Sequence, residues 1–348
     1  MKSLYDISWQ VTEAEYRADP ALSYSTLARY EREGFNNLDK LFDKIESPSL
    51  TFGSAVDTLI TGNDEEFDNN FMVAELTAPP SDVLITITKR LFNLFKGEYT
   101  TITDIPDNTL LDAISDIQWN NHWLPKTRVK KIKEDCKGYY ALLYIAEGKT
   151  ILSTKLYNEV SKTVDALKGS LATKFYFQTD SLWDTNIERF YQLKFKETFN
   201  NVDYRCMADL LLVIHDRNLV IPVDLKTSSK TEWDFYKSFL DWNYQIQARL
   251  YWRIIRANMD KDDYFKSFTL TNYRFIVANR HTLTPLVWEF ESTQKKGDII
   301  LGKNNQITLR DPFTIGEELL HYLKDKPNMP DNINKEKYNS LEKWINKL

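Results

Sequence analysis

The sequence has few cysteines and no long apolar run, and both absences narrow the class of protein. Among its 348 residues are only two cysteines, Cys136 and Cys206, too few for a disulfide framework or a cysteine-ligated zinc site. No apolar stretch approaches the roughly 18 residues of a membrane span, and the segment from Met1 to Asp6 lacks the apolar core of a signal peptide. We therefore expect a cytoplasmic protein with reduced thiols and no membrane contact.

Glycine and proline are also scarce, and acidic residues outnumber basic ones. The chain has only 10 Gly and 11 Pro, and 42% of its residues are hydrophobic. This composition excludes an intrinsically disordered protein and is sufficient for a full hydrophobic core. The formal net charge of -5 excludes a protein covered in positive potential, although a local basic channel would still suffice for nucleic acid. No histidine has the spacing of a metal ligand, and no zinc or nucleophile motif is present.

The most informative segment that is present runs from Cys206 to Thr227. Apolar residues 210–214 and 219–221 flank a polar turn at 216–218, which is typical of two β-strands joined by a tight hairpin. Folding this hairpin about Arg217 places Asp209 opposite residues 224–226. Because strand side chains alternate between faces, Asp224 and Lys226 point the same way. Two carboxylates and one ammonium group are therefore predicted to converge.

These residue types fit a divalent metal and a phosphodiester. Magnesium prefers oxygen ligands, usually one or two carboxylates together with water and substrate phosphate. A nearby lysine can hold the attacking water or stabilise charge that develops on phosphorus. The alternative is that Asp224 and Lys226 form an ordinary ion pair at a strand end, since the tripeptide D-x-K is common.

A helix is predicted from about 234 to 257, because Phe239, Trp242, Ile246, Leu250 and Ile254 form one apolar stripe. Gln247 and Tyr251 lie four residues apart on a neighbouring face of that helix, so they project in the same direction.

In order and approximate spacing, Asp209, Asp224, Lys226, Gln247 and Tyr251 match the pattern of the PD-(D/E)XK nuclease superfamily. The sequence resembles its branch of RecB nuclease domains and RecE-like (exonuclease VIII-type) phage or prophage exonucleases. Segments 22–27, 52–59 and 148–153 also resemble parts of these exonucleases. The resemblance covers about 20–325 and is firm over 186–255. Two cysteines are too few for the four-cysteine iron–sulfur cluster of some relatives.

One position departs from the family pattern. Where relatives usually have a histidine that helps to bind the metal, this chain has Asp57. Asp57 is interpreted as a third acidic ligand, the alternative being a helix aspartate stabilised by the helix dipole. Folding a second hairpin about Asn200 and Asn201 places Gln192 opposite Asp209, so Glu188 is assigned a structural or supporting role.

The resemblance implies a metal-dependent deoxyribonuclease, most simply an exonuclease that resects linear duplex ends for recombination. One or two Mg²⁺ or Mn²⁺ ions would be held by Asp209, Asp224, the backbone carbonyl of Leu225 and Asp57. Lys226 would orient the water, and Gln247 and Tyr251 would position the scissile strand. The resemblance also implies a bacterial or phage-infected cell, a single-strand annealing protein as a partner, and a homo-oligomer as one arrangement. The rival hypotheses are a catalytically weak or inactive DNA-binding module and a structural or assembly protein.

The predicted fold is α/β, with a central mixed β-sheet flanked by helices, as in restriction endonucleases. A mainly helical region, 1–150, would carry Asp57 and pack on the core, and 151–348 would form the nuclease core with C-terminal helices. Residues 71–150 look less regular. The predicted strands are 186–198, 202–214, 219–227, 272–278 and 286–291, and the other predicted helices are 153–167, 315–323 and 335–348.

The densest basic run includes Lys126, Arg128, Lys130 and Lys131, with Trp119, Trp123, Tyr139 and Tyr140 nearby. One interpretation has the cations on DNA phosphates and the aromatic rings stacked on bases. The alternative is a solvated helix face whose aromatic residues pack in the core. Arg249, on the Gln247 helix, is predicted either to reach DNA near the site or to face solvent.

Overall fold

The computed structural model describes residues 2–34, 38, 41, 47–61, 64–75, 80–178, 186–304 and 306–324. The chain divides into two compact units, one formed by Met1–Ser49 and Thr163–Leu348 and the other by Leu50–Lys162. This division differs from the expected boundary near residue 150, because the first residues belong with the sheet. The Leu22 amide donates to the Asp203 carbonyl (2.8 Å), and the Arg205 amide donates to the Leu22 carbonyl (2.9 Å).

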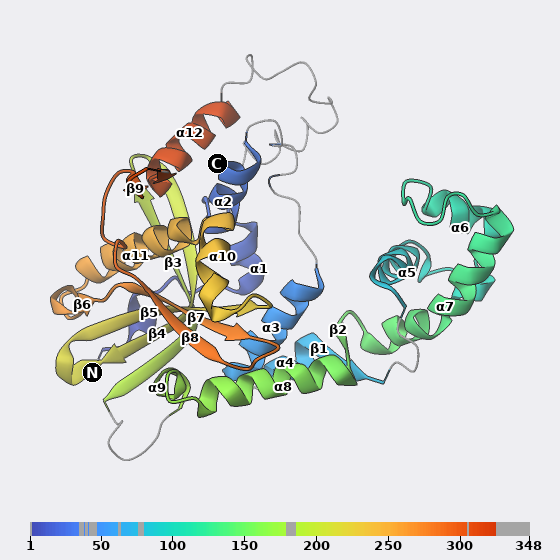
Figure 1. The fold of residues 1–348 in the computed structure, drawn as a ribbon, viewed down its shortest axis with the longest axis horizontal. Coiled ribbons are helices and arrows are strands. Elements are labelled where there is room, and N and C mark those ends of the chain that lie inside the picture. Colours follow the sequence, from blue (N-terminus) through green and yellow to red (C-terminus); the bar gives the residue numbers. More distant parts are fainter. Residues whose placement is uncertain are drawn as a thin grey trace. The chain divides into compact units, whose positions relative to one another are not determined.

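The first unit is built on a six-stranded sheet with the strand order β3-β4-β5-β7-β8 and β6 paired to β5 (Figure 1). Its strands are β3 (Ile187–Phe199), β4 (Val202–Ile214), β5 (Leu219–Ser228), β6 (Thr269–Leu270), β7 (Tyr273–Asn279) and β8 (Pro285–Phe290). β5 and β7 are parallel, whereas β3–β4, β4–β5 and β7–β8 are antiparallel. The predicted mixed sheet and its five main strands are confirmed.

Four helices of this unit share one hydrophobic core with the sheet. They are α2 (Tyr24–Glu33), α10 (Phe235–Asp241), α11 (Tyr244–Asp260) and α12 (Pro312–Lys324). On α11, the buried side chains of Ile246, Leu250 and Ile254 recur at helical spacing, so one stripe of the helix packs on the sheet.

Helix α9 (Lys174–Phe177) lies against the other face of the sheet. Arg274 alternates along β7 with the core residues Tyr273 and Phe275, so its side chain leaves the opposite face. Its Nη1 donates to the Tyr176 hydroxyl (3.0 Å), and Arg189 Nε on β3 donates to the Tyr176 carbonyl (3.1 Å). Helices therefore flank the sheet on both faces, as predicted.

The single helix predicted over 234–257 is wrong. The chain forms the two helices α10 and α11, separated at Trp242 and Asn243. Asn243 has a left-handed backbone with φ of 53°, which ends the regular right-handed turn and which asparagine tolerates better than most residues. Trp242 consequently leaves the predicted apolar stripe and is 50% exposed.

The second unit is mainly helical, and this includes most of 71–150, where the sequence looked less regular. Its elements are α3 (Pro48–Ile60), α4 (Asp64–Asn70), β1 (Phe71–Ala74), α5 (Asp82–Phe95), η3 (Ile102–Asp104), α6 (Asp107–Ala113), α7 (Pro125–Ala146), β2 (Thr150–Ser153) and α8 (Thr154–Gly169), which crosses the division. A core that includes Ile87, Ile132 and Tyr140 holds α5, α6 and α7 together.

The remaining short elements belong to the first unit. They are η1 (Leu4–Ile7), α1 (Glu13–Ala18), η4 (His215–Arg217), η5 (Glu232–Asp234), η6 (Phe265–Ser267) and the antiparallel pair β9 (Ile299–Leu301) and β10 (Ile307–Leu309). The predicted helix 335–348 lies outside the described residues. Within the described ranges, no helix has the length and apolar content that crossing a bilayer would require.

Candidate functional site

The candidate site lies where β4 and β5 separate. β4 pairs with β5 only from Leu210 to Ile214, whereas β5 continues along β7 as far as Ser228. The last pair of the β4–β5 ladder is Leu210 with Val223, so Asp209 is the first residue beyond the fork. Its Oδ2 accepts a hydrogen bond of 2.9 Å from the Leu225 amide. The predicted register, with Asp209 opposite residues 224–226, is confirmed.

An irregularity in the β3–β4 ladder accompanies Asp209. Regular pairing is found on both sides of the Gln192–Asp209 position but not at it, which confirms that Gln192, rather than Glu188, lies opposite Asp209. Gln192 has a left-handed φ of 55°, a conformation that costs on the order of 1–3 kcal/mol for a residue other than glycine. Along β4, the core side chains change from Cys206 and Ala208 to Leu211. The side of β4 that faces this core therefore switches at Asp209.

Asp224 is the buried centre of the site. It is 1% exposed, Gln247 Nε2 donates to its Oδ1, and Lys226 Nζ lies 2.6 Å from its Oδ2. Asp224 Oδ2 and Gln247 Oε1 are buried without a hydrogen-bond partner among the described residues, although the former is ion-paired with Lys226. Asp224 is thus buried near the end of β5, where Gln247 of α11 contacts it.

Lys226 keeps its charge. Burial on its own would lower the pKa of the Lys226 ammonium, but Asp224, followed by Tyr244 and Asp209, raises that pKa above its usual value. Its Nζ also lies 4.8 Å from the centre of the Tyr244 ring. At neutral pH the side chain is therefore a cation and a hydrogen-bond donor.

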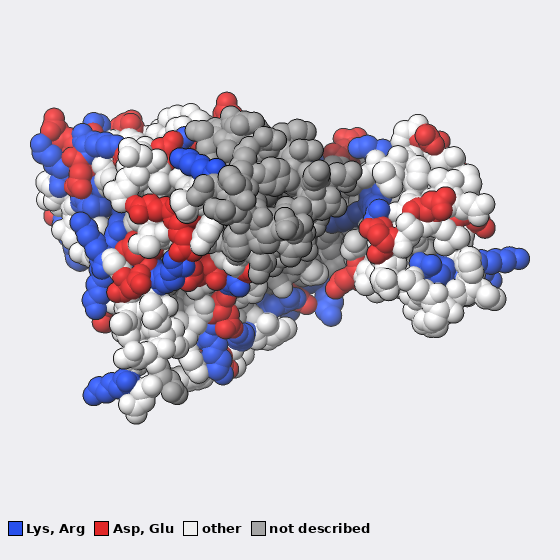
Figure 2. All heavy atoms as spheres, turned by 90° about the horizontal axis from the view of Figure 1, so that it is seen from above, with Lys and Arg blue, Asp and Glu red and all other residues white. Residues whose placement is uncertain are grey.

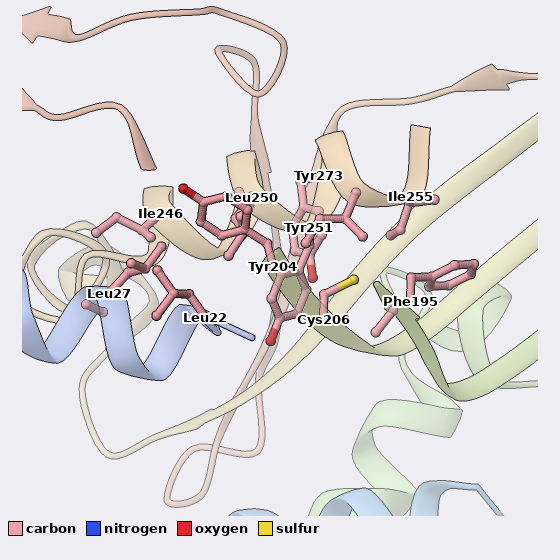
Figure 3. Close-up of a cluster of buried hydrophobic side chains, with 14 of the residues drawn as sticks. Leu22, Leu27, Phe195, Tyr204, Cys206, Ile246, Leu250, Tyr251, Ile255 and Tyr273 are labelled. Atoms are coloured by element: carbon pink, nitrogen blue, oxygen red, sulfur yellow. The ribbon is translucent and has the colours of Figure 1, made fainter. Parts of the chain in front are cut away.

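Two tyrosines extend the site into the core. Tyr251 on α11 and Tyr273 on β7 meet edge-on, with ring centres 6.3 Å apart (Figure 3). Burial first, and then groups that include Asp224 and Asp209, raise the pKa of both hydroxyls well above the ordinary value. The Tyr273 hydroxyl is buried and has no hydrogen-bond partner within the described part of the chain.

Sequence reasoning missed two residues beside the site, Tyr24 and Tyr273. Tyr24 begins α2, donates from its hydroxyl to the Trp242 carbonyl (2.8 Å), and has Lys226 among its charged neighbours. Tyr273 was included only as part of a predicted strand. Neither position carries a spacing signal, because each reaches the site through tertiary packing.

Other predicted residues are placed elsewhere. Asp57 lies on α3 in the second unit, so its role as a third ligand stays a prediction. Glu188 Oε2 lies 2.9 Å from His215 Nε2, in agreement with a structural role. The interpretation of Arg249 as a DNA-contacting or solvent-facing residue is wrong. Its side chain is buried, with Nη2 3.0 Å from Asp311 Oδ2.

The basic run belongs to α7 in the second unit. Lys130 lies 3.8 Å from Glu134, and Lys131 lies 2.9 Å from Asp135, so two of its cations pair with acids of the same helix. Tyr139 and Tyr140 are buried, which contradicts their role in base stacking. DNA contacts by Lys126, Arg128, Lys130 and Lys131 stay a prediction.

On the face shown in Figure 2, Lys and Arg side chains are interspersed with Asp and Glu over the described residues. No group of three or more His, Cys, Asp or Glu residues that could hold a metal ion is found in the described ranges. The site therefore rests on the pair of carboxylates and the lysine beside them.

Comparison with known proteins adds little to this geometry. No family model matches the chain, and no curated protein matches it. Among solved structures, a candidate exonuclease from Eubacterium rectale is similar to it. The match covers 92% of this chain and 85% of that chain, with 13% identity and a TM-score of 0.40. A likeness this loose carries no argument about activity.

Proposed function

We propose that this chain is a metal-dependent nuclease of the PD-(D/E)XK type that hydrolyses phosphodiester bonds in DNA. The observation that carries the proposal is the fork between β4 and β5. Asp209 is fixed there by the Leu225 amide, and Asp224 is held between Gln247 and Lys226. Asp209, Asp224, Lys226 and Gln247 are four of the five residues whose order in the sequence suggested a nuclease.

The donor groups present fit a hard divalent cation. Asp209 and Asp224 supply carboxylate oxygens, and the buried Oε1 of Gln247 is an oxygen acceptor without a partner among the described residues. Mg²⁺ commonly takes one or two carboxylates and completes its octahedron with water and phosphate oxygens. Asp209, Asp224 and the Leu225 carbonyl would hold Mg²⁺ or Mn²⁺. When bound, the ion would make water more acidic and offset charge that develops on the phosphate.

The protein's own groups would orient the reactants. The Lys226 ammonium retains its proton because of Asp224, so it would donate a hydrogen bond to a phosphate oxygen or to the attacking water. The Gln247 amide would fix the Asp224 carboxylate through Oδ1. Tyr251 lies one helical turn further along α11 and is buried in the same core as Cys206. Its ring would pack between that core and the Asp224 carboxylate.

The finer proposal is an exodeoxyribonuclease that resects linear duplex ends for recombination, beside a single-strand annealing protein. It is supported by the order of the motif residues and by the helix–sheet arrangement around them. A DNA-binding module without catalysis would keep the same fold, so activity must be measured directly.

The test is to incubate the full chain with Mg²⁺ or Mn²⁺ and a linear duplex, a covalently closed circle of the same sequence, a single strand, or RNA. We expect acid-soluble nucleotides from linear DNA and none from the closed circle. The activity should be lost in EDTA and in the variants Asp209→Asn, Asp224→Asn and Lys226→Met. Glu188→Gln is the matched control, because this carboxylate lies on the same sheet but pairs with His215.

Cleavage of the closed circle would overturn the exonuclease assignment while leaving a nuclease. DNA binding without cleavage under any metal condition would favour the inactive module. Neither binding nor cleavage, in protein that unfolds cooperatively, would reject the nuclease proposal and favour a structural role. Full activity in Lys226→Met would reject the role of that ammonium group.

A further inference from the structure

A row of cations and aromatic rings leads from the buried carboxylates to the surface. It begins with Lys226, which pairs with Asp224 and lies 4.8 Å from the centre of the Tyr244 ring. The rings of Tyr244 and Tyr24 follow, with centres 6.4 Å apart, and the Tyr24 hydroxyl is bonded to the Trp242 carbonyl. The row thus joins β5, α2 and the break between α10 and α11.

The outer end of this row is Trp242 with Arg32. The Arg32 guanidinium lies 5.0 Å from the centre of the Trp242 ring, and the indole is 50% exposed. The exposed part of this indole offers a flat apolar surface on which another ring can stack. The hydrogen bond from the Tyr24 hydroxyl to the Trp242 carbonyl fixes the backbone position of Trp242.

Among the described residues, no carboxylate lies within ion-pair distance of the Arg32 guanidinium. Its two acidic sequence neighbours are engaged elsewhere: Glu31 lies 2.9 Å from Arg310, and Glu33 lies 3.2 Å from Arg29. Asp241, next to Trp242, lies 3.1 Å from Lys230. A cation that stacks on a half-exposed indole is complementary to a polyanion that carries flat rings, and Tyr24, Tyr244 and Lys226 connect this pair to the Asp224 carboxylate.

We propose that Arg32 and Trp242 bind the unpaired end of a nucleic-acid strand next to the scissile phosphate. One base stacks on the exposed face of the indole, and a phosphate binds to Arg32. This inference rests on the proposed function and makes its substrate more specific, because a base that is splayed from the duplex onto the indole loses its pairing partner. The strand that enters the site is therefore single-stranded over at least this nucleotide.

The test measures the affinity of the full chain for a short fluorescein-labelled single strand, by anisotropy in EDTA so that no hydrolysis occurs. Trp242→Ala should weaken binding by about 5- to 160-fold, the effect of removing one stacked base, and Trp242→Phe should recover much of it. Arg32→Ala should weaken binding and reduce the salt dependence by about 0.7 in log–log slope, the contribution of one phosphate on a single strand.

Two controls separate stacking from general effects. Trp233 is 83% exposed and lies in η5 of the same unit, so Trp233→Ala removes a comparable indole and should leave affinity unchanged. On a strand with an abasic nucleotide at each position in turn, one position should abolish the difference between wild type and Trp242→Ala. The effect of Arg32→Ala should persist there.

The possible failures are distinguishable. If the wild type cleaves DNA but Trp242→Ala and Arg32→Ala bind the strand as tightly as the wild type, the inference fails and the nuclease stands. An equal loss in Trp233→Ala would also reject it, since the effect would then be nonspecific. If the wild type neither binds nor cleaves any strand, both the inference and the proposed function fail.

Discussion

Removing one hydroxyl group from the core should make this protein more stable. Tyr273 is 0% exposed, and its hydroxyl has no hydrogen-bond partner among the described residues. A buried polar group without a partner costs about 1–3 kcal/mol relative to its hydrated state. In Tyr273→Phe the ring and its edge-on contact with Tyr251 are kept, and only the unsatisfied group is lost. We expect the free energy of unfolding to rise by about 1–2 kcal/mol.

The assay is thermal and urea unfolding in EDTA, followed by circular dichroism. For a unit of this size the expected gain corresponds to a rise in Tm of roughly 2–6 °C. The matched control is Tyr204→Phe in the same core, whose hydroxyl donates to the Phe313 carbonyl over 3.4 Å. That change removes a hydrogen bond and should lower stability by about 0.5–1.5 kcal/mol.

A lower Tm for Tyr273→Phe would refute this reasoning, because it would show that the hydroxyl has a stabilising partner, such as an enclosed water. Repeating the measurement with Mn²⁺ adds a second readout. If the hydroxyl gains a partner only when the carboxylates hold a cation, the stabilisation by Mn²⁺ should be smaller in the variant than in the wild type. Equal stabilisation by Mn²⁺ in both proteins would restrict Tyr273 to a structural role.

Two further predictions concern groups far from solvent. Arg249→Met removes the closer of the two guanidinium groups that pair with the buried Asp311 carboxylate, while Arg253 remains 3.5 Å from it, so we expect a loss of about 1–3 kcal/mol in urea unfolding; an unchanged midpoint would contradict the burial of this pair. Burial raises the pKa of Cys136 to about 11 and that of Cys206 further, so little thiolate exists at neutral pH. Ellman's reagent should therefore label neither thiol in the native protein and both in denaturant, and rapid native labelling would show that a thiol is accessible.

The strands around the site could be predicted because their signals are local. The apolar run of 210–214, the turn at 216–218 and the apolar run of 219–223 define one hairpin, and its turn fixes the register. Register then decides that Asp209 faces Leu225 and that Gln192 faces Asp209. Both followed from counting residues outward from the turns at Arg217 and at Asn200–Asn201.

What could not be predicted depends on tertiary contacts or on single backbone angles. Arg249 has the charge of a surface residue, yet the Lys295, Gly297 and Arg310 carbonyls and the Asp311 carboxylate accept its hydrogen bonds in the core. No local pattern shows that such partners will be available. The helix break likewise depends on Asn243, where one positive φ outweighs an otherwise continuous helical periodicity. No bounds were predicted for helices α5 to α7, although they lie inside the region that was expected to be mainly helical.

The same logic separates the two interpretations of Asp224 and Lys226. An ordinary ion pair at a strand end would be solvated and worth about 0–1 kcal/mol, and the fold would lose little without it. Here the carboxylate is 1% exposed, so its desolvation cost must be met by Lys226 and by the amide of Gln247. Nearby, Gln192 has a strained backbone, and Gln247 Oε1 and Tyr273 Oη are buried without a hydrogen-bond partner in the described structure. Several costs concentrated at one fork of the sheet are not explained by stability, whereas a ligand that uses these groups would offset them.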